Sequence, residues 1–434
     1  MFFSSLRALA LLSLVFAMTR IVPAANNSPM QGQQAIVGRS GWIKVGLQSV
    51  VRKQQVGLPV GGRILDGLDK ELGRLTKGSN VFVDGSAGGI IVTTSNGRIG
   101  PLNSVTIEPL SPSAGGYFEL PSGRYRGRCL MVSRGSGFQI INHLQLDDWL
   151  RGVLPAEIGD EAPLEALKAQ AVAARSEAVR KLVRPPHADA GFDFCTGVHC
   201  QAYKGMKEEV PAANQAVDET FGIVLIANNE VIDAVYHNVC GGTTGSPDEV
   251  WDSKPEACLT PVYDRAKGQA PVNLSGESAM NQFLNSNLGD YFCNPAQPGY
   301  PNYAKKYFRW QKSMSGDEAG RRAGVGRLKD IQVVDRRPSG RVRKLRLDGD
   351  RGSKTIEKEL PIRNAFDLWS GVFVVRTERS GGYIQTVEFV GAGNGHGVGL
   401  CQMGARTMAN LGFKYDQIVA HYYPGSQLKR IYRP

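Results

Sequence analysis

The sequence predicts an α+β fold, in which one buried helix is surrounded by β-rich segments. Short apolar runs separated by Gly, Ser and Asn recur between residues 41 and 110, a pattern typical of β-strands. Residues 163–182 have instead the three- and four-residue apolar spacing of a helix. Basic and apolar residues alternate after residue 335, as in strands with one solvated face. With 434 residues, 42% of them hydrophobic, we expect two or three domains with substantial cores.

The first residues are typical of an export signal. Arg7 supplies a positive flank, residues 8–18 are apolar, and Val22-Pro23-Ala24 resembles a cleavage site. The apolar run is shorter than the ~20 residues of a membrane span, so we expect export to the periplasm or the extracellular cell wall. Membrane attachment is the alternative if this segment is not cleaved.

We divide the chain into six parts by composition. They are an export signal (1–25), a polar linker (26–39), an N-terminal β-rich module (40–114), a central domain (115–257), a second mixed domain (258–375) and a C-terminal segment that completes the central domain (376–434).

The chain is basic, with a formal net charge of +11. Such a charge suits an acidic wall polymer, anionic lipid or nucleic acid, and export argues against nucleic acid. Six of the basic residues alternate with apolar ones, which favours a solvated strand face over a binding patch. They are Arg336, Arg337, Arg341, Arg343, Lys344 and Arg346.

The predicted central helix begins near Pro163, whose fixed φ suits a first helical turn. Just upstream, Pro155 disfavours helical geometry at Leu154, so we expect Glu157 on a loop that leads into the helix. A carboxyl group beside Leu154, Pro155 and Ile158 would lose hydration, and its pKa would rise. Glu157 is then a candidate general acid. The alternative is an ordinary solvated loop carboxylate.

One cluster has the ligand types of a zinc site: His187, Cys195, His199 and Cys200. Two thiols and two imidazoles can form a closed tetrahedral site, which would be structural because no position is left for water. A Cys195–Cys200 disulfide is the competing interpretation in an exported protein.

The seven cysteines are an odd number, so at least one has no partner within the chain. Cys258 and Cys293 are a plausible disulfide across the second domain. Cys129 and Cys401 lie in apolar contexts typical of buried thiols.

Two further stretches contain candidate binding residues. Two predicted strands, 223–227 and 231–236, lead to His237, which either lines a cleft or is a hydrogen-bonded histidine at a strand end. Trp251 follows a glycine-rich stretch and could stack on a sugar ring. Near the C-terminus, glycines surround His396, which indicates either ligand approach or a tight turn, and a helix is predicted from Cys401 to Asn410.

Together these stretches resemble the SpoIID/LytB family, named for sporulation stage II protein D and an amidase enhancer. The resemblance covers roughly residues 115 to 434 and rests on the segments LRGVLPAEIG, PLEALKAQAVAARSEA, HCQAYKG, YHNVCGGTT and GHGVGLCQMGARTMANLGFKYDQIVAHYYPG. It implies a SpoIID-like catalytic domain and an activity, the lytic transglycosylase cleavage of peptidoglycan glycan strands stripped of their peptides. Glu157 matches the family's catalytic acid.

The resemblance also implies a structural zinc site at Cys195, His199 and Cys200, with His187 as the fourth ligand. No cofactor is required for the chemistry itself. One departure is Cys401, where related sequences commonly carry serine. We expect substrate-groove roles for Gln170, Arg175, His237, Trp251, His396 and Gln402. The expected partners are peptidoglycan strands and a cell-wall amidase, with no nucleic acid.

A single carboxyl is enough for lytic cleavage, because the substrate's own hydroxyl replaces water. Glu161 and Glu165 suit the start of the helix instead. The competing function is a non-enzymatic, wall-binding amidase enhancer. A zinc peptidase lacks support because the chain has no HExxH motif.

Overall fold

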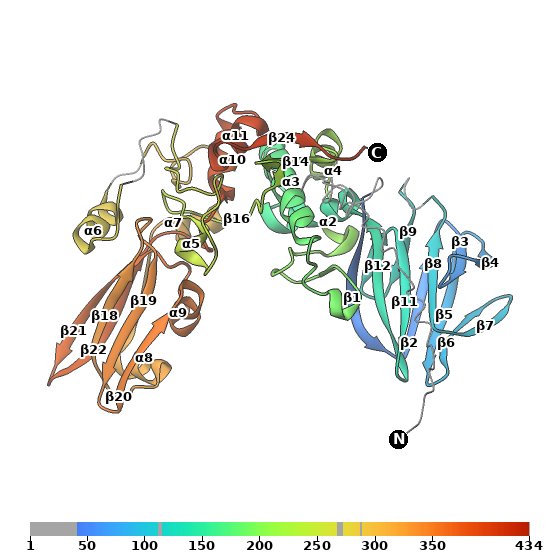
Figure 1. Ribbon diagram of the computed structural model, residues 1–434, viewed down its shortest axis with the longest axis horizontal. Helices are drawn as coiled ribbons and strands as arrows, with labels where there is room; N and C mark the ends of the chain where they lie inside the picture. The colour runs from blue at the N-terminus through green and yellow to red at the C-terminus, as the bar shows by residue number, and fades with distance from the viewer. Residues whose placement is uncertain (1–40, 112–114, 267–271, 287–288, 434) are drawn as a thin grey trace, which may run out of the picture.

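The structure is a computed structural model that describes residues 41–111, 115–266, 272–286 and 289–433. Two β-rich lobes extend from a helical centre, so that the molecule forms an arch (Figure 1). The predicted export signal and linker lie outside the described residues. None of the helices in the described ranges has the length and hydropathy needed to cross a membrane.

The N-terminal lobe contains two sheets that share one hydrophobic core. The first has the order β13 (Phe194–Cys195), β1 (Trp42–Val51), β12 (Gly137–Gln145), β11 (Arg128–Arg134), β8 (Ser104–Pro109), β3 (Gly62–Asp66), β4 (Glu71–Leu75). The second has the order β10 (Gly123–Arg126), β9 (Tyr117–Leu120), β2 (Lys53–Leu58), β5 (Ser79–Ser86), β6 (Gly89–Thr94), β7 (Gly97–Leu102). The strands predicted from the short apolar runs between residues 41 and 110 are confirmed, among them β1, β5 and β6.

Strands on both sides of residue 115 belong to these two sheets. β12 pairs with β1, β11 pairs with β8, and β9 pairs with β2. The boundary that we drew between residues 114 and 115 therefore passes through a shared core rather than between two cores.

The centre of the arch is helical, and small strands pack against its helices. It contains α2 (Leu146–Ile158), α3 (Leu164–Lys181), α4 (Pro211–Glu219), α10 (Gln402–Asn410) and α11 (Tyr415–Tyr422). A three-stranded sheet has the order β15 (Glu230–Val231), β14 (Ile223–Ala227), β24 (Gln427–Arg430), and β16 (Tyr236–His237) pairs in parallel with β23 (Leu400–Cys401). Single turns are formed by η2 (Ala188–Ala190), η3 (Gly205–Glu208) and α5 (Pro247–Val250).

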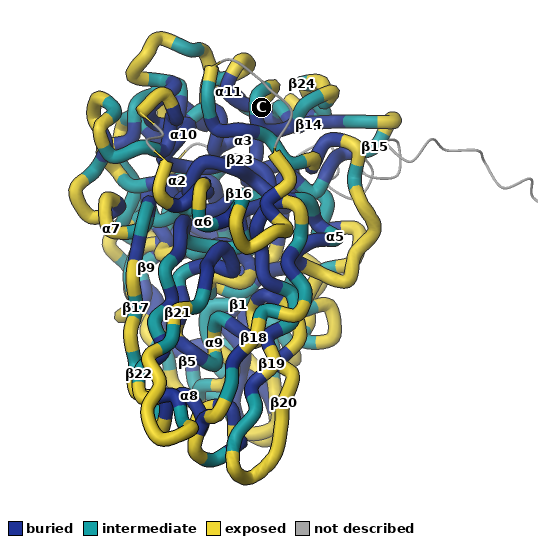
Figure 2. Tube along the Cα trace, turned by 90° about the vertical axis from the view of Figure 1, so that its left-hand side faces the viewer, coloured by how far each residue is buried: buried dark blue, intermediate teal, exposed yellow. Residues whose placement is uncertain are grey.

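The predicted central helix is confirmed as α3, which is the most deeply buried helix of the centre together with α10 (Figure 2). The expected loop around Glu157 is wrong. Residues 146–158 form α2, and Pro155 lies inside its last turn. Proline removes one backbone hydrogen bond there, but the buried side chains of Leu150, Val153 and Leu154 hold the turn in place. Gly159, with φ of 91°, ends the helix.

The C-terminal lobe has its own hydrophobic core between two three-stranded sheets and two helices. The sheets have the orders β17 (Trp310–Ser315), β22 (Tyr383–Gly391), β21 (Phe373–Ser380) and β18 (Leu328–Arg336), β19 (Val342–Gly349), β20 (Gly352–Glu357). The helices are α8 (Gly316–Ala323) and α9 (Glu359–Phe366), and α6 (Glu277–Asn285), η4 (Asn302–Ala304) and α7 (Lys305–Phe308) connect the lobe to the centre. Because β22 pairs with both β17 and β21, this lobe extends past the predicted boundary at residue 375.

The prediction of a solvated basic face is wrong for two of its six residues. Arg336 and Arg341 are buried. The Arg341 guanidinium donates to the backbone oxygens of His396 (2.9 Å) and Gly397 (3.1 Å), so it holds the glycine-rich turn around His396. Alternation along a strand predicts which residues share a face, but it does not reveal which face a neighbouring loop covers.

Candidate functional site

A continuous groove crosses the helical centre. It consists of three adjoining cavities of about 630, 400 and 410 Å³. Glu157, Val198 and Tyr236 line both the first and the second cavity. The second and third share Asp233, Val235 and Trp251. The groove therefore has the elongated form that a polymer chain requires.

Glu157 lies in the last turn of α2, at the junction of the first two cavities. Its Oε1 accepts a hydrogen bond of 2.8 Å from the backbone N–H of Ala202. Burial raises the pKa of the Glu157 carboxyl above its ordinary value, although the Ala202 bond and the charge of Lys181 oppose this shift. The carboxyl is thus fixed in orientation and inclined to keep its proton, as a general acid needs.

The Ala202 N–H is positioned by an unusual backbone conformation at the preceding residue. Gln201 has φ of 114°, a region that side chains other than glycine rarely occupy. The Gln201 side chain is buried and donates to the Ala174 carbonyl (3.1 Å) and to Oε2 of Glu177 (3.0 Å). Helix α3 therefore holds in place the loop that hydrogen-bonds Glu157, and such strain is typical of functional sites.

The predicted zinc ligands come together beside this loop. The Nε2 atoms of His187 and His199 are 3.1 Å apart, and Cys200 Sγ lies 3.3 Å from His187 Nε2. All four candidate donor atoms of His187, Cys195, His199 and Cys200 lie within 4.8 Å of one another. Neither cysteine is in a disulfide. The cluster fits a tetrahedral Cys₂His₂ zinc ion, and Ala202 follows its last ligand by two residues.

The proposed Cys258–Cys293 disulfide is wrong, because both cysteines are free in the structure. The Sγ of Cys293 lies 3.4 Å from that of Cys240 instead. Cys129 and Cys401 are buried thiols, as predicted.

Trp251 and His396 form one wall of the groove. Trp251 is 38% exposed, and its ring centroid lies 5.0 Å from that of His396. His396 accepts a bond from the Val398 N–H at Nδ1 (3.1 Å) and donates from Nε2 to the Tyr236 carbonyl (2.8 Å). Burial, with His237 nearby, lowers the pKa of the His396 imidazole well below its ordinary value. The His396 imidazole is therefore neutral, and its ring packs against Trp251 in the side of the groove.

His237 and Gln402 line the cavity on the other side of Glu157. His237 Nδ1 donates to the Val398 carbonyl at 3.1 Å, while its Nε2 is buried with no hydrogen-bond partner among the described residues. Gln402 Nε2 donates to Oε1 of Gln170 at 3.5 Å. Gln170 is fully buried behind Gln402, so it supports the groove without lining it.

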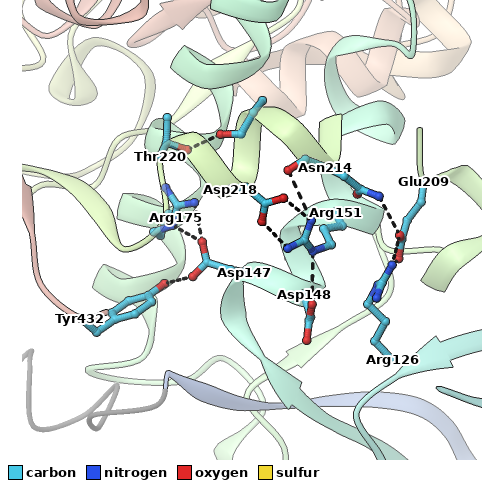
Figure 3. A network of polar contacts seen from close by, with 11 residues as sticks. Arg126, Asp147, Asp148, Arg151, Arg175, Glu209, Asn214, Asp218, Thr220 and Tyr432 are labelled. Atoms are coloured by element: carbon cyan, nitrogen blue, oxygen red, sulfur yellow. Dashed lines mark hydrogen bonds and ion pairs between the residues drawn. The ribbon is translucent and has the colours of Figure 1, made fainter. Parts of the chain in front are cut away.

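Arg175 lies away from the groove. Its buried guanidinium donates to Oδ1 of Asp147 (2.6 Å), and the Tyr432 hydroxyl donates to the other Asp147 oxygen at 2.6 Å (Figure 3). The guanidinium also donates to the Ile223 carbonyl at 2.9 Å. The network joins α2, α3, β14 and the C-terminal residues. We therefore assign Arg175 a structural role in place of the predicted contact with substrate.

The sequence interpretation did not name several groove residues, among them Glu177, Lys181, Asp233, Tyr236 and Tyr303. Glu177 forms an ion pair of 2.6 Å with Lys181, and burial raises the pKa of its carboxyl to about 7. The sequence did contain a signal for this pair. Glu177 follows the candidate residue Gln170 by seven residues and precedes Lys181 by four, so all three lie on one face of α3.

Comparison with known proteins gives two family matches. The SpoIID family, described as Stage II sporulation protein, matches residues 134–226, and a domain of unknown function, DUF8618, matches residues 246–399. A stage II sporulation protein D of Bacillus subtilis (strain 168) is 26% identical over 306 residues, which are 67% of this chain and 76% of that protein.

These matches support the predicted resemblance to the SpoIID/LytB family. An amidase enhancer of the same bacterium is 27% identical over 308 residues, 64% of this chain and 40% of the enhancer. An uncharacterized protein of Brachyspira hyodysenteriae is 27% identical over 309 residues, 71% of this chain and 73% of that protein. The SpoIID match contains Glu157 and the Cys₂His₂ cluster, whereas Trp251 and His396 lie in the DUF8618 match.

Proposed function

We propose that this chain is an exported peptidoglycan lytic transglycosylase. The observation that carries the proposal is the Glu157 carboxyl, which is raised in pKa, held by the Ala202 N–H and exposed to the middle of an elongated groove. The names of the relatives, a stage II sporulation protein and an amidase enhancer, support a role at the cell wall.

Glu157 acts first as an acid and then as a base. The protonated carboxyl donates its proton to the glycosidic oxygen between N-acetylmuramic acid and N-acetylglucosamine as the bond from that oxygen to the muramyl C1 breaks. The resulting carboxylate accepts the proton of the muramyl C6 hydroxyl while its oxygen bonds to C1. The product is a 1,6-anhydromuramyl end, and Glu157 recovers its proton.

Exposed aromatic side chains near opposite ends of the groove support a glycan substrate. Trp251 lines the second and third cavities, and Tyr303, which is 53% exposed, lines the first. Aromatic faces pack well against the apolar faces of sugar rings. Glu157 lies between these two residues, so a strand that contacts both would pass over the acid.

We also propose that His187, Cys195, His199 and Cys200 bind a structural zinc ion. The ion would fix the loop that contains Ala202, because Gln201 and Ala202 directly follow Cys200. A Cys200→Ser variant is expected to lose the zinc ion of this cluster and most activity, while Cys258→Ser keeps both. Full activity in a folded Cys200→Ser protein whose cluster binds no zinc would contradict this role.

The second candidate function is binding to the wall and stimulation of an amidase. The relative named amidase enhancer favours it, since its match covers 64% of this chain. This function needs the groove but not a proton on Glu157.

Digestion of purified, peptide-free glycan strands tests the proposal. We expect anhydromuramyl ends, detected by mass spectrometry, from the parent and from Glu161→Gln, whose carboxyl is exposed four residues away. Glu157→Gln should release no detectable anhydromuramyl ends. Reducing ends would instead indicate hydrolysis with Glu177 or Asp233 activating water. No products from a folded parent that still stimulates an amidase would establish the binding function.

A further inference from the structure

A second cluster of metal-ligand types lies in the interior, outside the groove and outside the Cys₂His₂ cluster. Cys240, Asp264, Cys293 and Cys401 have one ligand atom each within 4.8 Å of the others. All four residues are at most 2% exposed. We propose that these residues form a second, buried site that binds one zinc ion through three thiolates and one carboxylate oxygen.

The distances suit this ion. Zinc binds thiolate sulfur at about 2.3 Å, so the sulfur atoms of a tetrahedral site lie about 3.8 Å apart. The Sγ atoms of Cys240 and Cys293 are 3.4 Å apart, and the remaining pairs are within the 4.8 Å limit. Three thiols favour zinc over magnesium or calcium, which take oxygen ligands.

The surroundings orient the four ligands. Asp264 Oδ2 accepts a 2.7 Å bond from the Cys293 N–H, and its Oδ1 accepts from the Tyr422 hydroxyl. Cys401 Sγ accepts from the Cys240 N–H at 3.2 Å. Hydrogen bonds of this kind fix the ligands of metal sites.

The burial of a carboxylate calls for a cation. A buried charge is stable only when it is paired or coordinates a metal. Arg309 lies nearby, but its guanidinium donates to the carbonyls of Gly241 and Phe308, at 2.8 Å each. Its positive charge would offset part of the excess negative charge of three thiolates and a carboxylate around a divalent ion.

The position of the site indicates what it does. Cys240 follows β16, Cys401 ends β23 and precedes α10, and Cys293 and Asp264 come from the segment between the helical centre and the C-terminal lobe. Cys240 and Cys401 are 161 residues apart in sequence. No ligand position is open to substrate, so the ion is structural. Through Cys401, which directly precedes the groove residue Gln402, the ion would link the groove to the segment that contains Asp264 and Cys293 and leads to the C-terminal lobe.

The test measures metal content in the full chain by inductively coupled plasma mass spectrometry. The double variant Cys195→Ser/Cys200→Ser removes the first cluster and leaves the second intact. We expect it to retain one zinc ion per chain. Adding Cys401→Ser should remove that ion, whereas adding Cys258→Ser, at a buried cysteine outside both clusters, should not.

Cobalt substitution provides a second measurement that does not depend on the folding of Cys401→Ser. In the double variant, bound cobalt should show sulfur-to-metal charge-transfer absorption and the visible bands of a tetrahedral site. A folded double variant without bound zinc or cobalt would overturn the proposal. So would a Cys240–Cys293 disulfide, detected as thiols that react with alkylating agents only after reduction.

Discussion

Helix α3 carries Arg175 and Glu177 two positions apart, and their charges are balanced in different ways. The Arg175 guanidinium and the Tyr432 hydroxyl both donate to the Asp147 carboxylate (Figure 3), and Arg175 also donates to the Ile223 carbonyl. Glu177 faces the groove beside Glu157, where three carboxyls, those of Glu157, Glu177 and Asp233, share one lysine, Lys181.

On α2 and α3, the residues of the Arg175 network therefore contribute to stability, whereas the groove residues Glu157 and Glu177 are available for chemistry. Paired charges on the network side hold α2, α3 and the C-terminal residues together. On the groove side the carboxyls are buried with too little positive charge, so their pKa values rise and they keep protons that a reaction can use. Substitutions on the two sides should therefore affect different measurements.

The largest effect is expected from Glu157→Gln. Loss of the general acid should reduce the rate of anhydromuramyl release by about 10⁴-fold, while the free energy of unfolding changes by less than about 1 kcal/mol. In the parent, kcat/KM should fall as the pH rises through the raised pKa of Glu157, because only the protonated form can donate. A rate independent of pH, or a strongly destabilised Glu157→Gln protein, would contradict the assignment of Glu157 to chemistry and not to stability.

The second effect is expected from Asp147→Ala on the network side. It leaves the Arg175 guanidinium buried without its carboxylate, which should cost about 3–5 kcal/mol in denaturant unfolding. Asp218→Ala is the matched control, because Asp218 pairs with Arg151 but has a 58% exposed side chain. That variant should cost less than about 1 kcal/mol. Equal costs for both would show that burial does not decide the strength of these pairs.

The third prediction concerns Glu177 and pH. Its pKa is raised from 4.5 to about 7 in the folded protein. A carboxyl with a raised folded-state pKa contributes stability that is full below about pH 4.5 and is lost as the pH rises to about 7. Glu177→Gln stays neutral, so relative to it the parent should lose on the order of 3 kcal/mol across this window. Unfolding curves at several pH values check this, and parallel pH profiles of the two proteins would refute it.

The smallest effect is expected from Trp251→Ala. Loss of the exposed ring should raise KM for glycan strands by about fivefold with little change in kcat, because stacking contributes about 1 kcal/mol to binding. Trp251→Phe keeps an aromatic face and should lie between the parent and the alanine variant. An unchanged KM in Trp251→Ala would mean that the glycan does not contact this wall.

Local signals in the chain were enough for part of this structure. The period of apolar residues and Pro163 located α3, and the segment after Cys401 was correctly predicted as helix α10. The predicted cluster of His187, Cys195, His199 and Cys200 also comes together in the structure. The mixed α+β composition is also confirmed. These features depend on residues close together in sequence, where preferred dihedral angles and periodicity dominate.

Other features were decided only by tertiary packing. Pro155 was expected to prevent a helix, but burial of the neighbouring apolar side chains outweighs the one lost hydrogen bond. Arg175 was expected in the groove, and Asp147 and Tyr432, distant in sequence, hold it elsewhere. The Cys240, Asp264, Cys293 and Cys401 cluster joins four separate segments. No local pattern specifies such contacts, because they depend on which surfaces of the folded elements are buried against one another.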